Sequence, residues 1–397
     1  FQAEDGIRDL VRSRGLGDVY KRQAQRPAQP EAAFHQQVDR MDSDPEDKGN
    51  PKAGDRKNAH LSLAAAPLAQ SGRAAGFARV TLDHSALPEC DLGSIDTSTS
   101  WLGKKLAAPL FIGSMTGGTD HADAINDALA ETAEACGIGL AVGSQRASLE
   151  SGRSQSRLRS FAPSVPLVGN LGGVQIAADG GVDLARRAVE DIGADALFIH
   201  LNPLQEAVQP EGETDWRGVL AAIEAVRDAC ACPILVKEVG AGINAATASR
   251  LFDIGVHAVD VAGLGGTNWT RIEAARRADA DLFTPFLDWG VPTVDALMKV
   301  RTMIPAGRLI ASGGVMNGLD AAKALWLGAE MVSMAGAVLR AISDDGISSP
   351  DRERACAHIG QWKEQLRLAL FLTGAGSLAG LSKVGGTVDG HPYQAGI

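Results

Sequence analysis

The sequence has 397 residues, 45% of them hydrophobic, and a net charge of −10 at pH 7. A chain of this length and apolar content can bury a full core, so a globular enzyme is the expected class. The acidic balance argues against a general nucleic-acid binder, and no apolar run reaches the ~18 residues that span a membrane. The 5 cysteines are scattered, without zinc-site or disulfide-scaffold spacing, which predicts a reducing cytoplasm.

The first part of the chain, residues 1–50, is rich in Gln, Arg, Asp, Glu, Gly and Pro and has little periodicity. We predict that it is a disordered or non-native N-terminal extension. The pair Arg56-Lys57 and His60 then precede an Ala-rich apolar segment. Adjacent cations suit a diphosphate, but a solvated basic turn is the simpler interpretation of these residues alone.

From Leu106 onward, short apolar strands that end in Gly or polar residues alternate with Ala-rich helical stretches. Eight such units predict an α/β fold of the (β/α)8 barrel type. The candidate strands are 109–114, 139–143, 166–170, 196–201, 233–238, 258–262, 308–312 and 330–335. The clearest helices are 120–136, 216–229, 245–254 and 319–327.

The segment 351–373 predicts a closing helix with Trp362, Leu366, Leu370 and Phe371 on or near its apolar face, stopped by the glycines at 374–376. The barrel domain is therefore expected to span 51–376. The remaining residues, 377–397, are Gly-rich and are expected to form a flexible tail or to make subunit contacts.

The most informative stretch is 197–206, where the fourth candidate strand ends in polar residues. In a parallel barrel the chemistry is carried at the C-terminal ends of the strands. His200 and Asn202 are two residues apart and point the same way on an extended chain, while Pro203 ends the strand and places Gln205 and Glu206 in the following loop. The alternative is a strand end with an ordinary solvated loop.

The ends of the seventh and eighth candidate strands are glycine-rich, at 313–314 and 336. Many barrels bind phosphate there on backbone N–H groups, so a phosphorylated cofactor is expected. Lys237, at the end of the fifth strand, has apolar neighbours and needs an anionic or electron-rich partner, which the N1–C2 carbonyl edge of a flavin would supply.

Together these motifs resemble the type 2 isopentenyl-diphosphate isomerases, which are FMN-binding barrels. The resemblance runs from Arg56 to about Phe371. Each glycine motif alone is weak evidence for the family, but the motifs together and in this order are specific to it. The motifs are Arg56-Lys57 with His60, 115–118 (MTGG), 144–146 (SQR), His200-x-Asn202-x-x-Gln205-Glu206, 236–240 (VKEVG), 265–267 (GGT) and 312–314 (SGG).

The resemblance implies a set of site residues. FMN would contact Met115, Thr116, Gly117, Ser144, Asn170, Lys237 and Thr267, with its phosphate near Gly314, Val315, Met316, Ala335 and Gly336. The substrate diphosphate would be held by Arg56, Lys57, Ser144, Gln145 and Arg146, with Gln205 beside the alkene and Glu206 binding Mg²⁺. One departure is Asn268, which stands where the family often has Ser.

The implied reaction is a 1,3-proton shift that interconverts isopentenyl and dimethylallyl diphosphate. FMN would be reduced by NADPH, but the reaction has no net redox. The resemblance also implies a cytoplasmic homo-oligomer (tetramer or octamer) that binds neither nucleic acid nor membrane. Gln205, His200 and Asn202 are the catalytic candidates; His200 either moves a proton or orients its neighbours. One rival function is an FMN-dependent 2-hydroxy-acid oxidase, which would need a His–Asp base and arginines for a carboxylate. A second is a noncatalytic barrel that binds a phosphate ligand.

Overall fold

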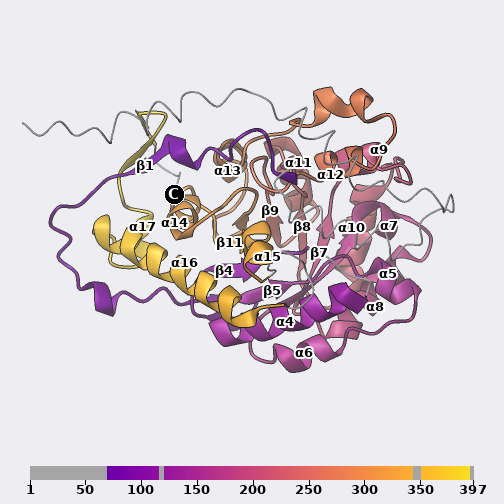
Figure 1. Ribbon diagram of the computed structural model, residues 1–397, viewed down its shortest axis with the longest axis horizontal. Helices are drawn as coiled ribbons and strands as arrows, with labels where there is room; N and C mark the ends of the chain where they lie inside the picture. The colour runs from indigo at the N-terminus through magenta and orange to yellow at the C-terminus, as the bar shows by residue number, and fades with distance from the viewer. Residues whose placement is uncertain (1–68, 116–119, 343–349, 394–397) are drawn as a thin grey trace, which may run out of the picture. The chain divides into compact units, whose positions relative to one another are not determined.

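The computed structural model describes residues 69–115, 120–342 and 350–393. Within them, eight parallel strands close into a barrel in the order β10-β11-β4-β5-β6-β7-β8-β9, which confirms the predicted (β/α)8 fold (Figure 1). Each of the eight predicted strands is present. The strands are β4 (Leu110–Ile112), β5 (Gly139–Ala141), β6 (Leu167–Gly172), β7 (Ala196–His200), β8 (Ile234–Lys237), β9 (Ala258–Asp260), β10 (Leu309–Ala311) and β11 (Met331–Met334).

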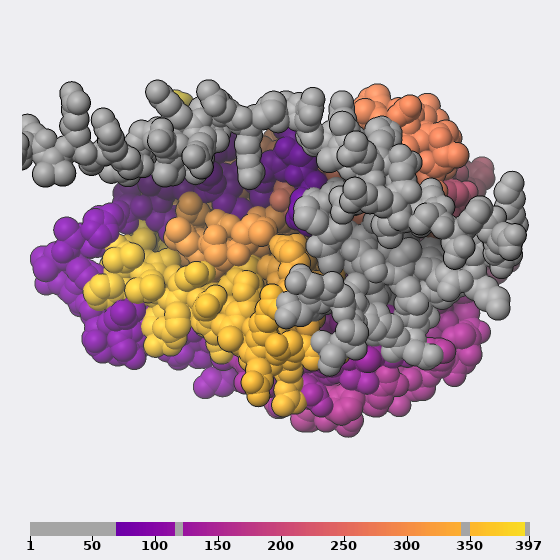
Figure 2. All heavy atoms as spheres, in the orientation of Figure 1, coloured from indigo at the N-terminus to yellow at the C-terminus, as the bar shows by residue number. Residues whose placement is uncertain are grey.

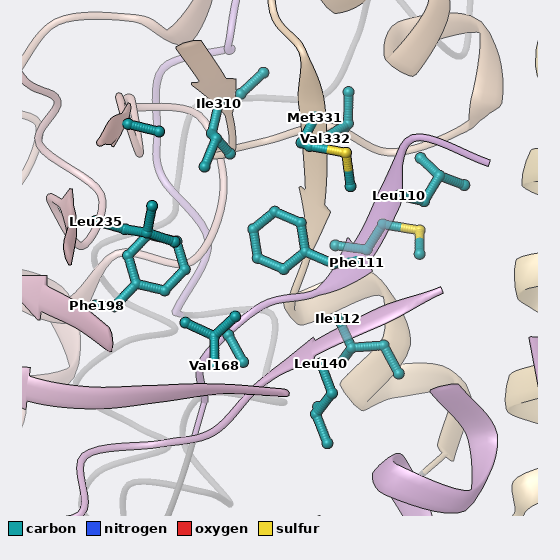
Figure 3. Packing of buried hydrophobic residues seen from close by; sticks show 14 of the residues in the cluster. Leu110, Phe111, Ile112, Leu140, Val168, Phe198, Leu235, Ile310, Met331 and Val332 are labelled. Atoms are coloured by element: carbon teal, nitrogen blue, oxygen red, sulfur yellow. The ribbon is translucent and has the colours of Figure 1, made fainter. Parts of the chain in front are cut away.

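The interior of the barrel is filled by side chains from several strands (Figure 3). Phe111 on β4 and Phe198 on β7 stack with ring centroids 6.2 Å apart, and Trp101 stacks on Phe111 from outside the barrel strands at 5.1 Å. All three are buried. Fully burying such a ring contributes roughly 1.5–3 kcal/mol, so this stack stabilises the barrel core beneath the site.

The strand register brings three polar side chains into one row. His200 at the end of β7 pairs with Lys237 at the end of β8, and Lys237 pairs with Asp260 at the end of β9. Because parallel strands all end at the same rim of the barrel, the last residues of these three strands lie beside one another. The row forms one side of the candidate site.

Helices follow the strands as predicted, and several begin at side-chain caps. Asn244, Asn317 and Asp351, for example, each accept a hydrogen bond from the backbone N–H three residues later. The α-helices of the barrel are α4 (Asp120–Cys136), α5 (Arg146–Glu150), α6 (Arg157–Phe161), α7 (Gly173–Ala177), α8 (Gly181–Ile192), α9 (Pro203–Val208), α10 (Val219–Ala229), α11 (Ala245–Asp253), α12 (Trp269–Ala274), α13 (Thr293–Arg301), α14 (Gly318–Trp326) and α15 (Gly336–Ile342). A 3-10 helix, η4 (Ala280–Phe286), follows α12 and contacts it.

The predicted closing helix is α16 (Arg352–Leu372), with Trp362, Leu366 and Leu370 buried and Phe371 partly buried. It packs against α4, α14 and α15, and on the face shown in Figure 2 its yellow atoms adjoin the orange atoms of the chain before it. Gly374, with a φ of +68°, ends it as the sequence predicted.

The tail prediction needs correction, because residues 377–393 form regular elements. They contain α17 (Leu378–Leu381), β12 (Gly386–Val388) and β13 (His391–Pro392). β12 pairs antiparallel with β1 (Val80–Leu82), and Trp326 Nε1 donates to the Val384 carbonyl at 2.8 Å. Backbone pairing with a strand about three hundred residues earlier in the chain satisfies the tail's polar groups, which a local pattern cannot reveal.

Two smaller structures precede the barrel. The 3-10 helices η2 (Phe77–Arg79) and η3 (Leu92–Ser94) flank β1, and β2 (Thr99–Trp101) and β3 (Lys104–Leu106) form a hairpin. Across the described ranges, no helix has both the length and the apolar character needed to cross a membrane. The predicted N-terminal extension, 1–50, lies outside the described residues.

Candidate active site

A cavity of about 780 Å³, counted with its open mouth, lies at the C-terminal ends of the barrel strands. Phe111 and Phe198 line it from the barrel interior, so the packed core forms its floor. Its walls come from the loops after β8, β9, β10 and β11. This is the position at which barrel enzymes of this type carry their chemistry.

The loops after β9 and β10 approach each other so closely that only glycine fits. A Cβ on Gly266 would lie 2.6 Å from the Gly314 nitrogen, and one on Gly314 would lie 2.4 Å from the Gly265 carbonyl oxygen. Gly314 also has a φ of +70°, which residues with a side chain rarely adopt. This part of the wall is therefore made of exposed backbone, the kind of surface that binds phosphate oxygens.

The cavity wall also contains Lys237 and two carboxylates, Asp260 of the polar row and Glu238. Burial lowers the pKa of Lys237, while Asp260 and Glu238 act in the opposite direction. Burial raises the pKa of Asp260 to about 6, although Ser312 Oγ donates to it at 2.7 Å. The positive charge of Lys237 is thus balanced by carboxylates inside the wall.

Glu238 fixes the loop that follows β8. Its Oε2 accepts hydrogen bonds from the backbone N–H groups of Val239, Gly240, Ala241 and Gly242 at 2.6, 2.6, 2.5 and 3.1 Å. Burial raises its pKa despite these four donors. The carboxylate holds the chain in a tight turn around itself. Residues of this turn line both the cavity and a smaller cleft beside it.

His200 lies in the polar row and is held by a neighbour from β6. Its Nδ1 is 3.0 Å from Asn170 Oδ1. Burial, followed by the charge of Lys237, lowers the pKa of His200 to about 3. The imidazole is therefore neutral at physiological pH, and with Asn170 as acceptor it carries its proton on Nδ1.

Gln205, Asn202 and Glu206 form one hydrogen-bonded group on α9. Asn202 Nδ2 donates to Gln205 Oε1 at 3.2 Å and to Glu206 Oε1 at 2.9 Å. Gln205 Nε2 donates in turn to Glu273 Oε1 on α12 at 2.9 Å. Because both ends of the Gln205 amide are occupied, its orientation is fixed.

Glu273, which the sequence did not single out, is fully buried and contacts Arg276 at 2.5 Å. Arg276 also reaches Glu211 at 3.0 Å. A buried carboxylate needs such a partner, since an unpaired charge in the interior is costly. Gln205 itself lines an adjoining cleft with Leu204, Leu264, Trp269 and Trp289, which provides an apolar wall beside the amide.

Glu206, the predicted Mg²⁺ ligand, is 7% exposed, and its Oε2 accepts from the Glu213 N–H at 2.8 Å. The Glu213 side chain contacts Arg146 at 3.1 Å and Gln175 at 3.1 Å. Arg146 also pairs with Glu150 at 2.9 Å. The predicted diphosphate arginine is thus held by two carboxylates at the rim, next to the predicted metal ligand.

One predicted substrate residue has a different place. Gln145 is fully buried; its Nε2 donates to the Ala188 carbonyl at 2.9 Å, and its Oε1 accepts from the Asn170 N–H at 3.0 Å. Both halves of the amide are satisfied by backbone, so the side chain supports the strand ends. Substrate contact by Gln145 stays a prediction, and its side-chain amide already has its hydrogen-bond partners within the protein.

The predicted cofactor residues fall into three groups. Met115, Ser144 and Asn170 are described but are not among the residues that line the cavity, and Asn170 contributes through His200. Thr116 and Gly117 lie outside the described residues, as do the predicted substrate residues Arg56 and Lys57. Those that line the cavity are Lys237, Thr267, Gly314, Val315, Met316, Ala335 and Gly336.

Two details refine this picture. The N–H of Met316 donates to Asp320 Oδ2 at 3.1 Å, so it already has a partner within the protein. Asn268, the departure from the family pattern, caps α12 by accepting from the Arg271 N–H at 3.1 Å, and its amide also donates to the Leu287 carbonyl. Its effect is to anchor the loop beside the apolar cleft.

The cavity also fits a phosphate-bearing flavin by its unsatisfied groups. Ser114 Oγ lines it and is buried without a hydrogen-bond partner among the described residues. Arg340, which no sequence motif singles out, also lines the cavity, and its buried Nη1 likewise has no partner among the described residues. A buried donor left without a partner costs roughly 1–3 kcal/mol, so such groups mark where a ligand belongs.

The fold and cavity define a barrel of the FMN-dependent class, and comparison with known proteins supports this. Residues 202–384 match the family described as FMN-dependent dehydrogenase. Solved structures of mandelate oxidase share the fold at 18–19% identity, one with the monooxide FMN adduct (TM-score 0.58, 84% of this chain and 99% of that one) and one with (S)-2-phenylpropionate (0.59, 84% and 97%).

Curated relatives are much closer in sequence. Isopentenyl-diphosphate delta-isomerase of Stutzerimonas stutzeri is 50% identical over 82% of this chain and 94% of that protein. The proteins of the same name from Xanthobacter autotrophicus and Synechocystis are 48% and 41% identical, over 84% and 83% of this chain and 97% and 94% of their own lengths. The chain belongs to the isopentenyl-diphosphate delta-isomerase family and is an enzyme of that family.

Proposed function

We propose that this enzyme interconverts isopentenyl and dimethylallyl diphosphate by moving a proton across the allylic system, with reduced FMN and Mg²⁺ and without net redox. The observation that carries the proposal is the orientation of Gln205. Its amide is held at both ends by Asn202 and Glu273, beside an apolar cleft that adjoins the flavin cavity. An uncharged hydrocarbon tail fits such a wall better than a carboxylate does.

FMN would occupy the main cavity. The backbone around Gly314 and Gly336 would hold its phosphate, and Lys237 would face the N1–C2 carbonyl edge of the ring. When bound and reduced, the ring supplies electron density that stabilises developing positive charge and a position that exchanges a proton. Burial lowers the pKa of Lys237, and the neighbouring Asp260 and Glu238 oppose this effect.

Gln205 would position the alkene, and its hydrogen bond to Glu273 would keep the amide oxygen and nitrogen from exchanging places. Glu273 is fully buried, so the Gln205–Glu273 contact is shielded from water. Hydrogen bonds in such a low-dielectric region are stronger than in solvent. The pair therefore restricts which face of the substrate the enzyme's proton-transferring groups can reach.

His200 would act as a neutral hydrogen-bonding group and not as the base. A pKa near 3 makes protonation of its imidazole unfavourable at physiological pH. Its Nδ1 is held by Asn170, which leaves Nε2 as the acceptor nitrogen of the ring. Of the two roles considered for His200, orientation of its neighbours is the one this environment supports.

Mg²⁺ would be held by Glu206 together with phosphate oxygens of the substrate and water. Among the described residues no group of three His, Cys, Asp or Glu side chains could hold a metal alone. Mg²⁺ is commonly bound by one or two carboxylates plus substrate phosphates, so a single buried carboxylate is sufficient. Arg146 would exchange its contact with Glu213 for the diphosphate when substrate binds.

The rival 2-hydroxy-acid oxidation fits the side chains less well. That chemistry would need a histidine paired with a carboxylate, whereas the partner of His200 is the neutral amide of Asn170. The carboxylate of the polar row, Asp260, accepts from Ser312 Oγ and is affected by the charge of Lys237, so it is not a partner of His200 either. The likeness to mandelate oxidase therefore concerns the barrel and not this set of side chains.

Three further proposals rest on the family resemblance: NADPH as the reductant, a homo-oligomeric state of four or eight chains, and a cytoplasmic location. The last is also supported by the cysteines, all 5 of which are free thiols.

The function is tested by anaerobic incubation of the purified protein with FMN, Mg²⁺, NADPH and isopentenyl diphosphate in deuterated water. We expect dimethylallyl diphosphate that carries solvent deuterium. As a parallel substrate, (S)-mandelate should leave the oxidised flavin unreduced. Reduction of the flavin by mandelate, with no isomerisation, would replace the proposed function by the rival one.

A further inference from the structure

Arg340 reaches back over the start of its own helix. It lies on α15, four residues after Gly336, and helical side chains lean toward the N-terminus, so its guanidinium lies above Gly336. A Cβ built on Gly336 would be 3.1 Å from Arg340 Nη1 and 2.9 Å from Thr267 Oγ1. A guanidinium and a hydroxyl thus converge on a space that only glycine leaves open.

The charges around the cavity are unevenly distributed. Among the described residues that line it, Lys237 and Arg340 are the two cations, and Asp260 and Glu238 are the two carboxylates. Both carboxylates act on Lys237. Neither carboxylate acts on Arg340, and its buried Nη1 has no hydrogen-bond partner among the described residues.

The surroundings of Arg340 make its charge still less favourable in the absence of an anion. Burial lowers the pKa of Arg340, and no described group offsets this effect. Behind it, on α16, lies His358, whose pKa is lowered by burial and then by the charge of Arg340, and whose buried Nε2 also lacks a described partner. A guanidinium in such a position is stabilised by an anion that accepts its N–H groups.

We infer that Arg340 binds the terminal phosphate of FMN and makes this enzyme select FMN over riboflavin. This rests on the proposed function, which supplies the flavin, and adds a residue outside the glycine loops that the sequence motifs point to. A phosphate monoester carries a charge of about −1.5 to −2 at neutral pH and three acceptor oxygens. Arg340 and Thr267 would donate to it from one side, and the backbone around Gly314 would line the other.

The test compares two ligands that differ only in the phosphate. Apoprotein of wild type, Arg340→Met and Arg340→Lys is titrated with FMN and with riboflavin, and binding is followed by flavin fluorescence. In Arg340→Met we expect the affinity for FMN to fall about ten- to a hundredfold, as for loss of a charge-assisted hydrogen bond, while the affinity for riboflavin stays unchanged. Arg340→Lys should recover part of the loss, since it keeps the charge but not the planar fork.

Arg367→Met on α16 is the matched control, because Arg367 pairs with Glu364 and is not among the cavity-lining residues. It should bind both flavins as wild type does. Equal weakening of FMN and riboflavin in Arg340→Met, or FMN binding that matches wild type in that variant, would overturn the inference and leave the proposed function intact. Failure of the wild type to bind either flavin would instead overturn the proposed function and this inference with it.

Discussion

The cofactor end and the substrate end of this site are built in opposite ways. Around Gly266, Gly314 and Gly336 the wall consists of backbone, and side chains are excluded by contacts of about 2.4–2.9 Å that an added Cβ would make. Around Gln205 the wall consists of side chains from separate helices, which hold one another by hydrogen bonds of 2.9–3.2 Å.

This difference separates two tasks. A phosphate has the same shape in every cofactor molecule, so rigid backbone donors can form much of its site. A proton transfer needs groups whose charge and orientation are set individually, and this is achieved here by neighbours such as Asn202 and Glu273. Changes at the first end should therefore affect flavin occupancy, and changes at the second should affect turnover with the flavin still bound.

The largest effect is expected from Glu206→Gln. The amide keeps the shape of the carboxylate but loses the charge that Mg²⁺ requires, and its NH2 group would face the donor of Asn202 or Glu213. We expect turnover at low Mg²⁺ to fall by about a hundredfold or more, with flavin content unchanged. Glu224→Gln, on the outer helix α10, makes the same chemical change and should leave turnover as in wild type. Full turnover of Glu206→Gln at low Mg²⁺ would remove Glu206 from the metal site.

The cofactor end is tested by Gly314→Ala. Gly314 and Gly103 both have positive φ, +70° and +77°, but a Cβ on Gly314 meets the Gly265 carbonyl oxygen whereas one on Gly103 meets nothing within 4 Å. Both variants should lose about 1–3 kcal/mol from backbone strain. Only Gly314→Ala should also lose bound FMN, measured by absorbance after desalting. Equal FMN content in the two variants would mean that the close backbone approach is not needed for the cofactor.

A smaller effect concerns the neutral state of His200, whose pKa of about 3 in the folded protein lies below the ~6.5 of an unfolded histidine. Between these values the unfolded chain binds more protons. The contribution of His200 to stability is therefore fully present above about pH 6.5 and falls as the pH drops toward 3, by up to about 1.4 kcal/mol per pH unit.

Urea unfolding at several pH values measures this slope. The pKa of Asp260 is raised to about 6, so that group acts in the opposite direction, and the signal from His200 is the difference between wild type and His200→Asn. The same substitution at exposed His84 is the control. If His200→Asn leaves the slope unchanged, the imidazole is not held neutral by its surroundings.

The smallest effect is expected from Glu213→Gln at the rim. The contact between Glu213 and Arg146 joins side chains that are 44% and 41% exposed, so its loss should change stability by less than about 1 kcal/mol. Because the Arg146 guanidinium then gives up a weaker contact to bind the diphosphate, KM for isopentenyl diphosphate should fall while kcat stays the same. Glu150→Gln removes the other carboxylate from Arg146 and should act in the same direction. A rise in KM would show that Glu213 assists substrate binding.

Much of this arrangement could be predicted from the sequence because it depends on local patterns. Short apolar runs that end in glycine identify the barrel strands, and the spacing of Trp362, Leu366 and Leu370 identifies the closing helix. The cofactor end could be recognised for the same reason, since Gly314 and Gly336 directly follow predicted strands.

The substrate end and Arg340 at the cofactor end depend on contacts between distant segments, which local patterns do not contain. Glu273 and Arg340 stand in short helices next to other polar residues and look like surface charges, yet one is fully buried and the other lines the cavity. Gln145 looked like part of a substrate motif, but packing against α8 turns its amide to the Ala188 carbonyl. In each case tertiary packing decides the role of the side chain.

The most direct test of an isomerase that needs a reduced flavin without consuming it is the number of dimethylallyl diphosphate molecules formed per NADPH oxidised. The measurement is made under anaerobic conditions with limiting NADPH and excess isopentenyl diphosphate. We predict many products for each NADPH, with the flavin still reduced at the end of the reaction. One NADPH consumed for each product would contradict this account, because the side chains around Gln205 would then serve a net redox reaction.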